Sequence, residues 1–154
     1  MNIFVLDQDP KIAAQMACDK HIVKMPLETA QMLCTIYHKN NLNAPYKRTH
    51  EKHPCTLWAG ISKENYDWLY EHGLSLSKEY TFRYGKVHAC ESIIKSLVSK
   101  NISFKWPSMT KFALAMPDQY KDKLDPVKSY RNYYIGDKKP IATWKNREIP
   151  DWFV

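Results

Sequence analysis

One polar line in the first third of the chain carries residue types that acid–base chemistry requires. On an α-helix, four polar residues of the segment ACDKHIVKMPLETAQML fall within about 80° of one another: His21, Lys24, Glu28 and Gln31. Nearly every other direction around that helix is apolar, which reverses the pattern of a surface helix. We therefore predict a buried helix whose polar line crosses the interior or forms the floor of a cleft.

Glu28 is the candidate general acid/base or electrostatic stabiliser of this line. Ionisable groups with unusual surroundings gather at functional sites, which favours a catalytic role for His21 and Glu28. The alternative is a structural network in which Lys24 bridges His21 and Glu28, because buried polar groups must be paired.

A second polar line is predicted further along the chain. Four residues fall within about 40° on the same projection: Asn65, His72, Glu79 and Arg83. Aromatic and leucine residues flank them, so we consider Asn65 and Arg83 candidate contacts for a nucleotide or its phosphate. The alternative is a solvated helix face with a Glu79–Arg83 ion pair at i, i+4.

Two basic segments also contain aromatic residues. The segment Ser129 to Lys139 mixes tyrosines with cations, and aromatic faces beside cations suit bases and phosphates. Its candidates for contact with nucleic acid or a nucleotide are Tyr130, Arg131 and Lys138, although Tyr130 also fits a core position. The loop Tyr46 to His53 is the second segment, with His53 as its candidate contact.

The histidines and cysteines do not predict a metal site. No pair of histidines has a recognised ligand spacing, and the four cysteines lie far apart without a CxxC pair. We expect buried reduced thiols, no metal and no cofactor.

The elements that must position these residues are predicted to be helical, in an all-α fold with residues 1–154 as a single domain. Only four glycines and nine prolines leave little room for the turns of an all-β protein. The apolar run Asn2 to Leu6 is either a short extended segment or a buried N-terminus. Asp9-Pro10 predicts a helix start. Helical periodicity then continues from Lys11 to about His38, with a kink or restart at Pro26.

Helix-capping and helix-breaking residues divide the rest of the chain into further elements. The predicted elements are a loop at Lys39–His53, a long helix capped by Ser62 and ending near Tyr84, a helix at Lys86–Lys100, a short helix around Ser108–Ala115, and a last helix opened by Asp125-Pro126 with Gly136 as its C′ residue.

The overall composition limits the classes of partner that the protein can have. The formal net charge is +7, which favours an anionic partner such as DNA or a nucleotide. No apolar run reaches the roughly 20 residues of a membrane span, and the opening residues do not resemble a signal peptide. We expect a cytoplasmic protein, in the host cytoplasm if the source is viral. The oligomeric state cannot be read from the sequence.

These motifs, in order along most of the chain, resemble the small helical phage pyrimidine-dimer DNA glycosylases of the endonuclease V type. That family carries an early histidine followed seven residues later by a catalytic glutamate, as His21 and Glu28 are in DKHIVKMPLE. HPCTLWAGISKENYDWLYEHG is similar to the entry to the family's long aromatic helix, and SYRNYYIGDKKPIATW to its tyrosine-rich C-terminal segment. The segments LDQDPKIAAQ and HPCTLWAG are more similar still to a group of small uncharacterised phage proteins.

The resemblance implies an endonuclease V-like helical fold and a pocket at Glu28, with His21 as a phosphate or sugar contact. The chain departs from the family pattern at three places. The family attacks with an N-terminal amine exposed by Met removal, whereas Asn2 is bulky and the following apolar run would bury the terminus. The family's basic residues beside the glutamate are Leu27 and Gln31 here. Lys24 is then a substitute amine nucleophile.

Three functions therefore remain open. The first is a phage-type DNA-processing enzyme of the glycosylase or lyase kind, acting on a base or sugar extruded from DNA. The second is a non-catalytic protein that binds a nucleotide or modified base, for example to sequester a nucleotide signal. The third is a metal-dependent nuclease.

Overall fold

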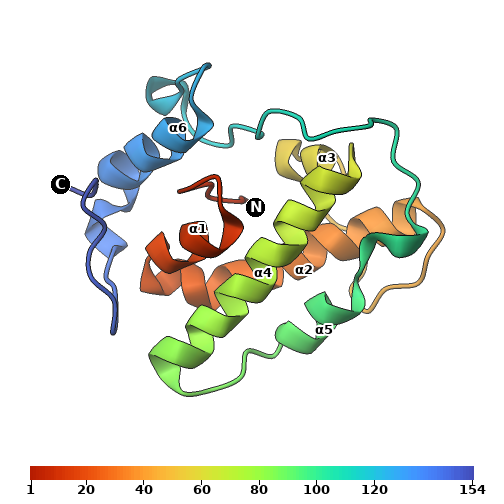
Figure 1. The fold of residues 1–154 in the computed structure, drawn as a ribbon, viewed down its shortest axis with the longest axis horizontal. Helices are drawn as coiled ribbons and strands as arrows, with labels where there is room; N and C mark the ends of the chain where they lie inside the picture. The colour runs from red at the N-terminus through yellow and green to blue at the C-terminus, as the bar shows by residue number, and fades with distance from the viewer.

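A computed structural model describes residues 1–154 and contains six α-helices and no β-sheet (Figure 1). The all-α prediction is thus confirmed. The α-helices are α1 (Pro10–Met16), α2 (Asp19–Lys39), α3 (Pro54–Ala59), α4 (Lys63–Tyr84), α5 (Glu91–Ser96) and α6 (Pro126–Tyr133). Short helical turns follow at η1 (Ser99–Asn101), η2 (Asp118–Tyr120), η3 (Tyr134–Lys138, a π-helix) and η4 (Lys139–Ile141). None of the helices is long and apolar enough to cross a membrane.

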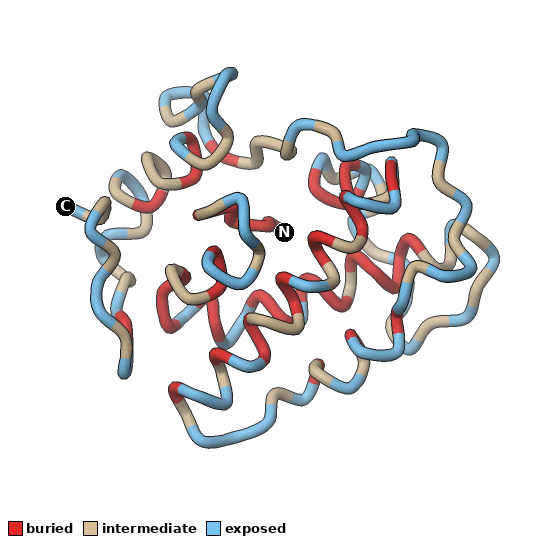
Figure 2. The backbone as a smooth tube through the Cα atoms, in the orientation of Figure 1, coloured by how far each residue is buried: buried red, intermediate tan, exposed pale blue.

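The buried side chains form one connected core, gathered along the N-terminal segment, α1, α2 and α4 (Figure 2). The N-terminal segment Asn2 to Leu6 is buried but irregular, so the second of its two predicted conformations is the observed one. Its backbone turns at Phe4, whose φ is 38°. The Asn2 side-chain oxygen stabilises that turn by accepting from the Ile3 and Phe4 amides at 2.8 and 3.2 Å.

The helix start at Asp9-Pro10 is confirmed, because the Asp9 carboxylate accepts from the Lys11 and Ile12 amides. Of the two predicted effects of Pro26, a kink or a restart, the restart is wrong. The chain leaves the helix at Ala17 and Cys18, and α2 then continues through Pro26. Pro26 is buried on a helix that packs against α3 and α4, and such packing can outweigh the cost of one missing helical hydrogen bond.

The long helix α4 has the predicted ends. Ser62 caps its N-terminus and Gly85, at a φ of 67°, terminates it in the left-handed conformation. Gly73 allows α4 to approach α2 closely, because a Cβ atom there would lie 2.6 Å from the Thr29 methyl group. This crossing fixes the two polar lines relative to each other.

Three predicted helical features are absent or shorter. Within 86–100 only Glu91–Ser96 is α-helical, with η1 following. Residues 108–115 form no helix; the Asn65 amide holds Thr110 by two hydrogen bonds, one of them to the Thr110 backbone amide. Gly136 lies inside η3 instead of ending a helix, and the Tyr120 ring fills the space that a side chain there would need.

Candidate active site

A small pocket lies where the N-terminal segment meets α2 and the junction of α6 with η3, and its volume is about 160 Å³. Figure 1 shows the N-terminus near the middle of the molecule, with α6 on one side and α3 and α4 on the other. Four of the residues singled out from the sequence line the pocket: His21, Lys24, Glu28 and Lys138. The other lining residues are Met1, Asn2, Phe4, Met25 and Tyr133.

Glu28 is the only acidic residue of the pocket, and it is 7% exposed. Its Oε2 atom accepts from the backbone amide of Asn2 at 3.0 Å and lies 3.6 Å from the amino group of Met1. The burial of the segment Ile3 to Leu6 therefore brings the N-terminal amine to Glu28, instead of removing it from the site as the sequence suggested. A carboxylate beside an amine can accept the proton that the amine must lose before it becomes a nucleophile.

Lys24 reaches the same carboxylate from α2. Its Nζ atom lies 3.4 Å from Glu28 Oε1, while 69% of its side chain remains exposed. A buried network in which Lys24 bridges His21 and Glu28 is therefore not formed, because Lys24 is at the mouth of the pocket and His21 has a different partner. Lys24 and the Met1 amine flank one carboxylate oxygen each.

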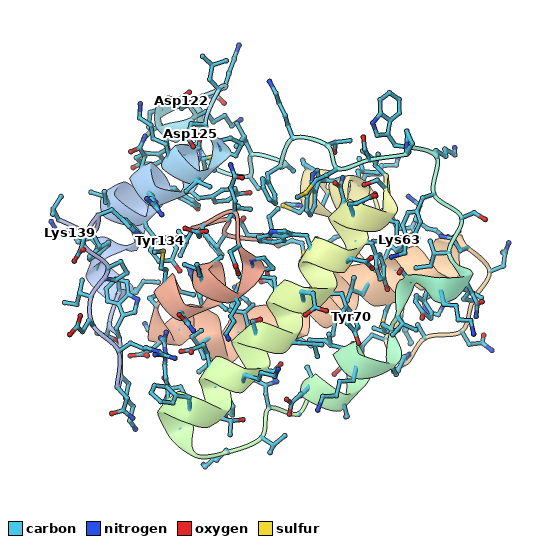
Figure 3. The ribbon with its side chains drawn as sticks, viewed as in Figure 1. Lys63, Tyr70, Asp122, Asp125, Tyr134 and Lys139 are labelled. Carbon is cyan, nitrogen blue, oxygen red and sulfur yellow. The ribbon has the colours of Figure 1, made fainter.

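His21 forms the inner wall. Its ring stacks on Phe4 with centroids 4.1 Å apart, and its Nδ1 atom is 2.5 Å from the hydroxyl of Tyr134. Figure 3 labels Tyr134 beside α6, on the side facing α1 and α2. Burial lowers the pKa of His21 to about 3, with Lys138 and Lys24 adding to the effect. The imidazole is therefore neutral at physiological pH.

The neutral imidazole has one nitrogen left for a ligand. The Tyr134 hydroxyl already accepts from the Cys18 amide at 3.3 Å, which leaves its own proton for Nδ1 and places the ring proton on Nε2. Nε2 has no hydrogen-bond partner in the protein, and it is not one of the fully buried polar atoms that lack a partner. His21 can thus donate a hydrogen bond into the pocket without carrying a charge.

Lys138 closes the opposite side. Its ammonium lies 4.6 Å from the centre of the Tyr133 ring and 5.9 Å from that of Phe4. Such cation–π contacts orient a partly exposed lysine without neutralising it. Lys138 therefore supplies the pocket with a fixed positive charge from a part of the chain far from α2.

His53 and Gln31 lie outside the pocket wall. His53 caps α3, where its Nδ1 atom accepts from the Cys55 amide at 3.1 Å. Burial lowers the pKa of His53, the N-terminal amine and His50 lower it further, and Glu28 opposes them, so His53 is within electrostatic reach of the pocket. Gln31 is half-buried, one turn beyond Glu28 on α2, and does not line the pocket.

Arg83 and Asn65 are interior residues, which corrects their assignment as phosphate or nucleotide contacts. Arg83 is 1% exposed and pairs with Asp19 and Glu79, each at 3.1 Å. It also donates to the carbonyls of Ala17 and Gln15, so four of its five N–H groups are used inside the fold and the side chain is buried away from any phosphate. Asn65 is fully buried and holds the irregular segment around Thr110.

Tyr130 and Arg131 are likewise occupied within the fold. Tyr130 is fully buried, and its hydroxyl donates to the Ala113 carbonyl at 2.6 Å. Arg131 donates to the Leu6 carbonyl at 3.0 Å, faces Asp7 at 3.6 Å and lies over Trp152. Arg131 thus joins the N-terminal segment to the C-terminal tail, and the aromatic–basic segment contributes only Lys138 to the pocket.

Sequence reasoning missed Phe4 and Tyr133, because neither follows from helical periodicity. Their position depends on the turn at Phe4 and on the packing of α6 against the N-terminal segment. The one usable signal was Asn2, since an asparagine with two following amides free can form such a turn. No three His, Cys, Asp or Glu side chains come together in a way that could hold a metal ion.

A comparison with known families finds one match. The family described as pyrimidine dimer DNA glycosylase matches residues 1–92. That range contains the N-terminal segment, α2 and α4, and hence Met1, His21, Lys24 and Glu28 of the pocket, while Tyr133 and Lys138 lie beyond it. No curated relative and no solved structure gives a significant match.

Proposed function

The chain belongs to the pyrimidine dimer DNA glycosylase family, and on this basis we propose that it excises a damaged pyrimidine from DNA at the Glu28 pocket. One observation carries the proposal: the buried Glu28 carboxylate lies 3.6 Å from the Met1 amine and 3.4 Å from that of Lys24. An amine beside a carboxylate is the pair that base displacement followed by strand cleavage requires. Most residues that line the pocket, Glu28 among them, lie within the range that matches the family, and this supports the same function.

In the proposed reaction the unprotonated amine attacks C1′ of the damaged nucleotide. The C1′–N bond breaks, and the base leaves with the bonding electrons and takes up a proton. The sugar ring then opens to give an imine between C1′ and the amine. Loss of a proton from C2′ expels the 3′ phosphate and breaks the strand. Glu28 first accepts the proton of the amine and later faces the positive charge that develops at C1′.

The remaining pocket residues serve to hold the substrate. Neutral His21 donates from Nε2 to a sugar or phosphate oxygen, and Lys138 neutralises a phosphate. The pocket opens beside Lys24, so the nucleotide must leave the base stack to reach Glu28, as enzymes acting on bases in duplex DNA require.

Two amines compete for the role of nucleophile. The Met1 amine is the more buried, and removal of Met1 would leave the Asn2 nitrogen, 3.0 Å from Glu28, as the new amine. Lys24 is more exposed. We favour the N-terminal amine, because a desolvated amine is held in place for attack, whereas Lys24 must leave solvent to reach C1′.

The test uses a duplex with a single cyclobutane pyrimidine dimer and the same duplex undamaged. We expect cleavage at the dimer only, and a covalent protein–DNA adduct when borohydride is added. Peptide mapping of the adduct, with mass analysis of the mature N-terminus, identifies the attacking amine. Lys24→Met should still be trapped, as should Lys20→Met, an exposed lysine of α2 outside the pocket that serves as the matched control.

A Lys24→Met variant that cleaves but is no longer trapped would contradict the N-terminal assignment. Tight retention of the damaged duplex, with neither cleavage nor an adduct, would contradict the glycosylase proposal and favour the non-catalytic binding protein instead.

A further inference from the structure

The largest cavity of the molecule is separate from the pocket at Glu28. It has a volume of about 460 Å³ and lies between the C-terminal end of α2, α3 and the segment that follows η1. Figure 1 shows this segment passing the end of α2 before it runs above α3. Ile36, on its wall, is eight residues after Glu28, which places the cavity about 12 Å along α2 from that carboxylate. We call it the Trp106 pocket.

Trp106 distinguishes this cavity. It is 56% exposed, and its indole N–H has no partner in the protein. The indole N–H groups of the other four tryptophans are all bonded inside the fold, at Thr110, Gln8 and Met16. An exposed ring with a free donor is typical of a binding surface rather than of a packed core.

The backbone holds this ring in a fixed place. The Trp106 amide donates to the Ile61 carbonyl at 3.1 Å, beside a bridge between Trp106 and Ser62. The Ser103 amide donates to the Asn40 side chain at 3.2 Å, so the segment is attached to the end of α2 as well. The exposure of Trp106 is therefore a property of an anchored segment.

The charged residues that line the cavity are all positive. Lys39 and Lys105 both contribute to the wall, neither is paired with a carboxylate, and no acidic residue lines the cavity. The nearby Lys63, labelled in Figure 3 at the start of α4, differs because it is paired with Asp67. Thr56, also in the wall, carries the one buried side-chain polar atom without a partner in the protein.

We propose that the Trp106 pocket binds a nucleotide, with the base stacked on Trp106 and the phosphate between Lys39 and Lys105. The volume lies in the usual range of small-molecule sites. Ile36 and Leu57 give the base an apolar surface, the Trp106 N–H can donate to it, and two unpaired cations meet the phosphate. The nucleotide is either free in solution or an unpaired unit of a DNA strand. The site does not depend on any chemistry at Glu28.

Calorimetric titration with thymidine monophosphate and with hexathymidylate tests the proposal. We expect binding that thymidine, which lacks the phosphate, reproduces only weakly. Trp106→Ala should weaken binding by about five- to 150-fold, and the double variant K39S/K105S should weaken it and remove most of its salt dependence. Lys123→Ser removes another exposed cation, outside both pockets, and should leave binding unchanged.

The two probes separate the sources of the nucleotide. Binding of both indicates a site for free nucleotides, whereas binding of hexathymidylate alone indicates a site for a DNA strand. The proposal is overturned if the wild type binds neither probe, or if Trp106→Ala and K39S/K105S, with unchanged melting temperatures, bind as tightly as the wild type. Glu28→Gln should retain binding, so a failure of the glycosylase proposal would leave this result intact.

Discussion

At the scale of single residues, the two cations beside Glu28 differ in what surrounds them. The Met1 amine is enclosed by the N-terminal segment, while most of the Lys24 side chain faces solvent. Exposed ion pairs contribute little to stability, so Lys24 gains little from Glu28. The position of Lys24 at the mouth of the pocket therefore favours a functional role over a stabilising one.

The low pKa of His21 predicts a specific loss of stability in acid. An unfolded histidine titrates near 6.5, whereas folded His21 titrates at about 3, so between these values the unfolded chain binds one more proton. Stability should be unaffected at pH 7 and should fall as the pH drops below about 6, by about 1.4 kcal/mol for each pH unit. His72, with its pKa lowered to about 4 by burial, adds to the loss.

Urea denaturation at pH 7, 6 and 5 measures this effect. His21→Gln removes one titrating group and should lose less stability over that interval than the wild type. Equal losses in the two proteins would show that His21 is not held neutral by the fold.

At the scale of elements, a charged network joins α2, α4 and the C-terminal tail. Arg83 of α4 binds Asp19 at the start of α2 and Glu79 one turn earlier. Arg147 of the tail binds Glu79 at 2.5 Å, and the Lys145 amide donates to Asp19. The network thus attaches the last residues of the chain to the helix that carries Glu28.

Arg83→Met should destabilise the protein by about 3 kcal/mol or more, because it leaves buried carboxylates without their central cation. The salt dependence of DNA binding should not change, whereas a lost phosphate contact would reduce its log–log slope by about 0.9. Arg48→Met, which breaks an exposed pair with Glu51, is the control and should cost at most about 1 kcal/mol. A less negative log–log slope of DNA binding in Arg83→Met would show that Arg83 contacts a DNA phosphate.

Local signals predicted the elements that they alone determine. Asp9 and Ser62 mark helix starts through their own side chains, and the structure confirms both. The predicted helix restart at Pro26 and the predicted helix at 108–115 were wrong, because packing against distant parts of the chain decides both. The polar line of α2 was visible in the sequence, and so were Glu28 and His21, but periodicity could not distinguish the buried Arg83 from a residue that faces a pocket.

At the scale of the whole molecule, the net charge of +7 must be distributed between surface and pockets. Lys24 and Lys138 flank one pocket, while Lys39 and Lys105 flank the other. Both pockets include residues of α2. On the two proposals above, this charge serves association with phosphates rather than the fold.

DNA binding should therefore weaken as salt rises, with a log–log slope of about −0.9 for each phosphate neutralised on a duplex. Lys138→Ser should make the slope less negative by about 0.9, and Lys123→Ser should leave it unchanged. Fluorescence anisotropy with a labelled duplex over a range of salt concentrations provides the slopes. A binding constant that is independent of salt would contradict an anionic partner altogether.

The cleavage rate of Glu28→Gln on dimer-containing DNA tests the central claim most directly. Glutamine keeps an oxygen to accept from the Asn2 amide but carries no charge. We predict a fall in rate of about 100-fold or more, with a melting temperature within about 4 °C of the wild type. Glu51→Gln, an exposed carboxylate, should retain the full rate. A folded Glu28→Gln protein that cleaves at the wild-type rate would contradict the claim, as would a loss of cleavage that merely follows unfolding.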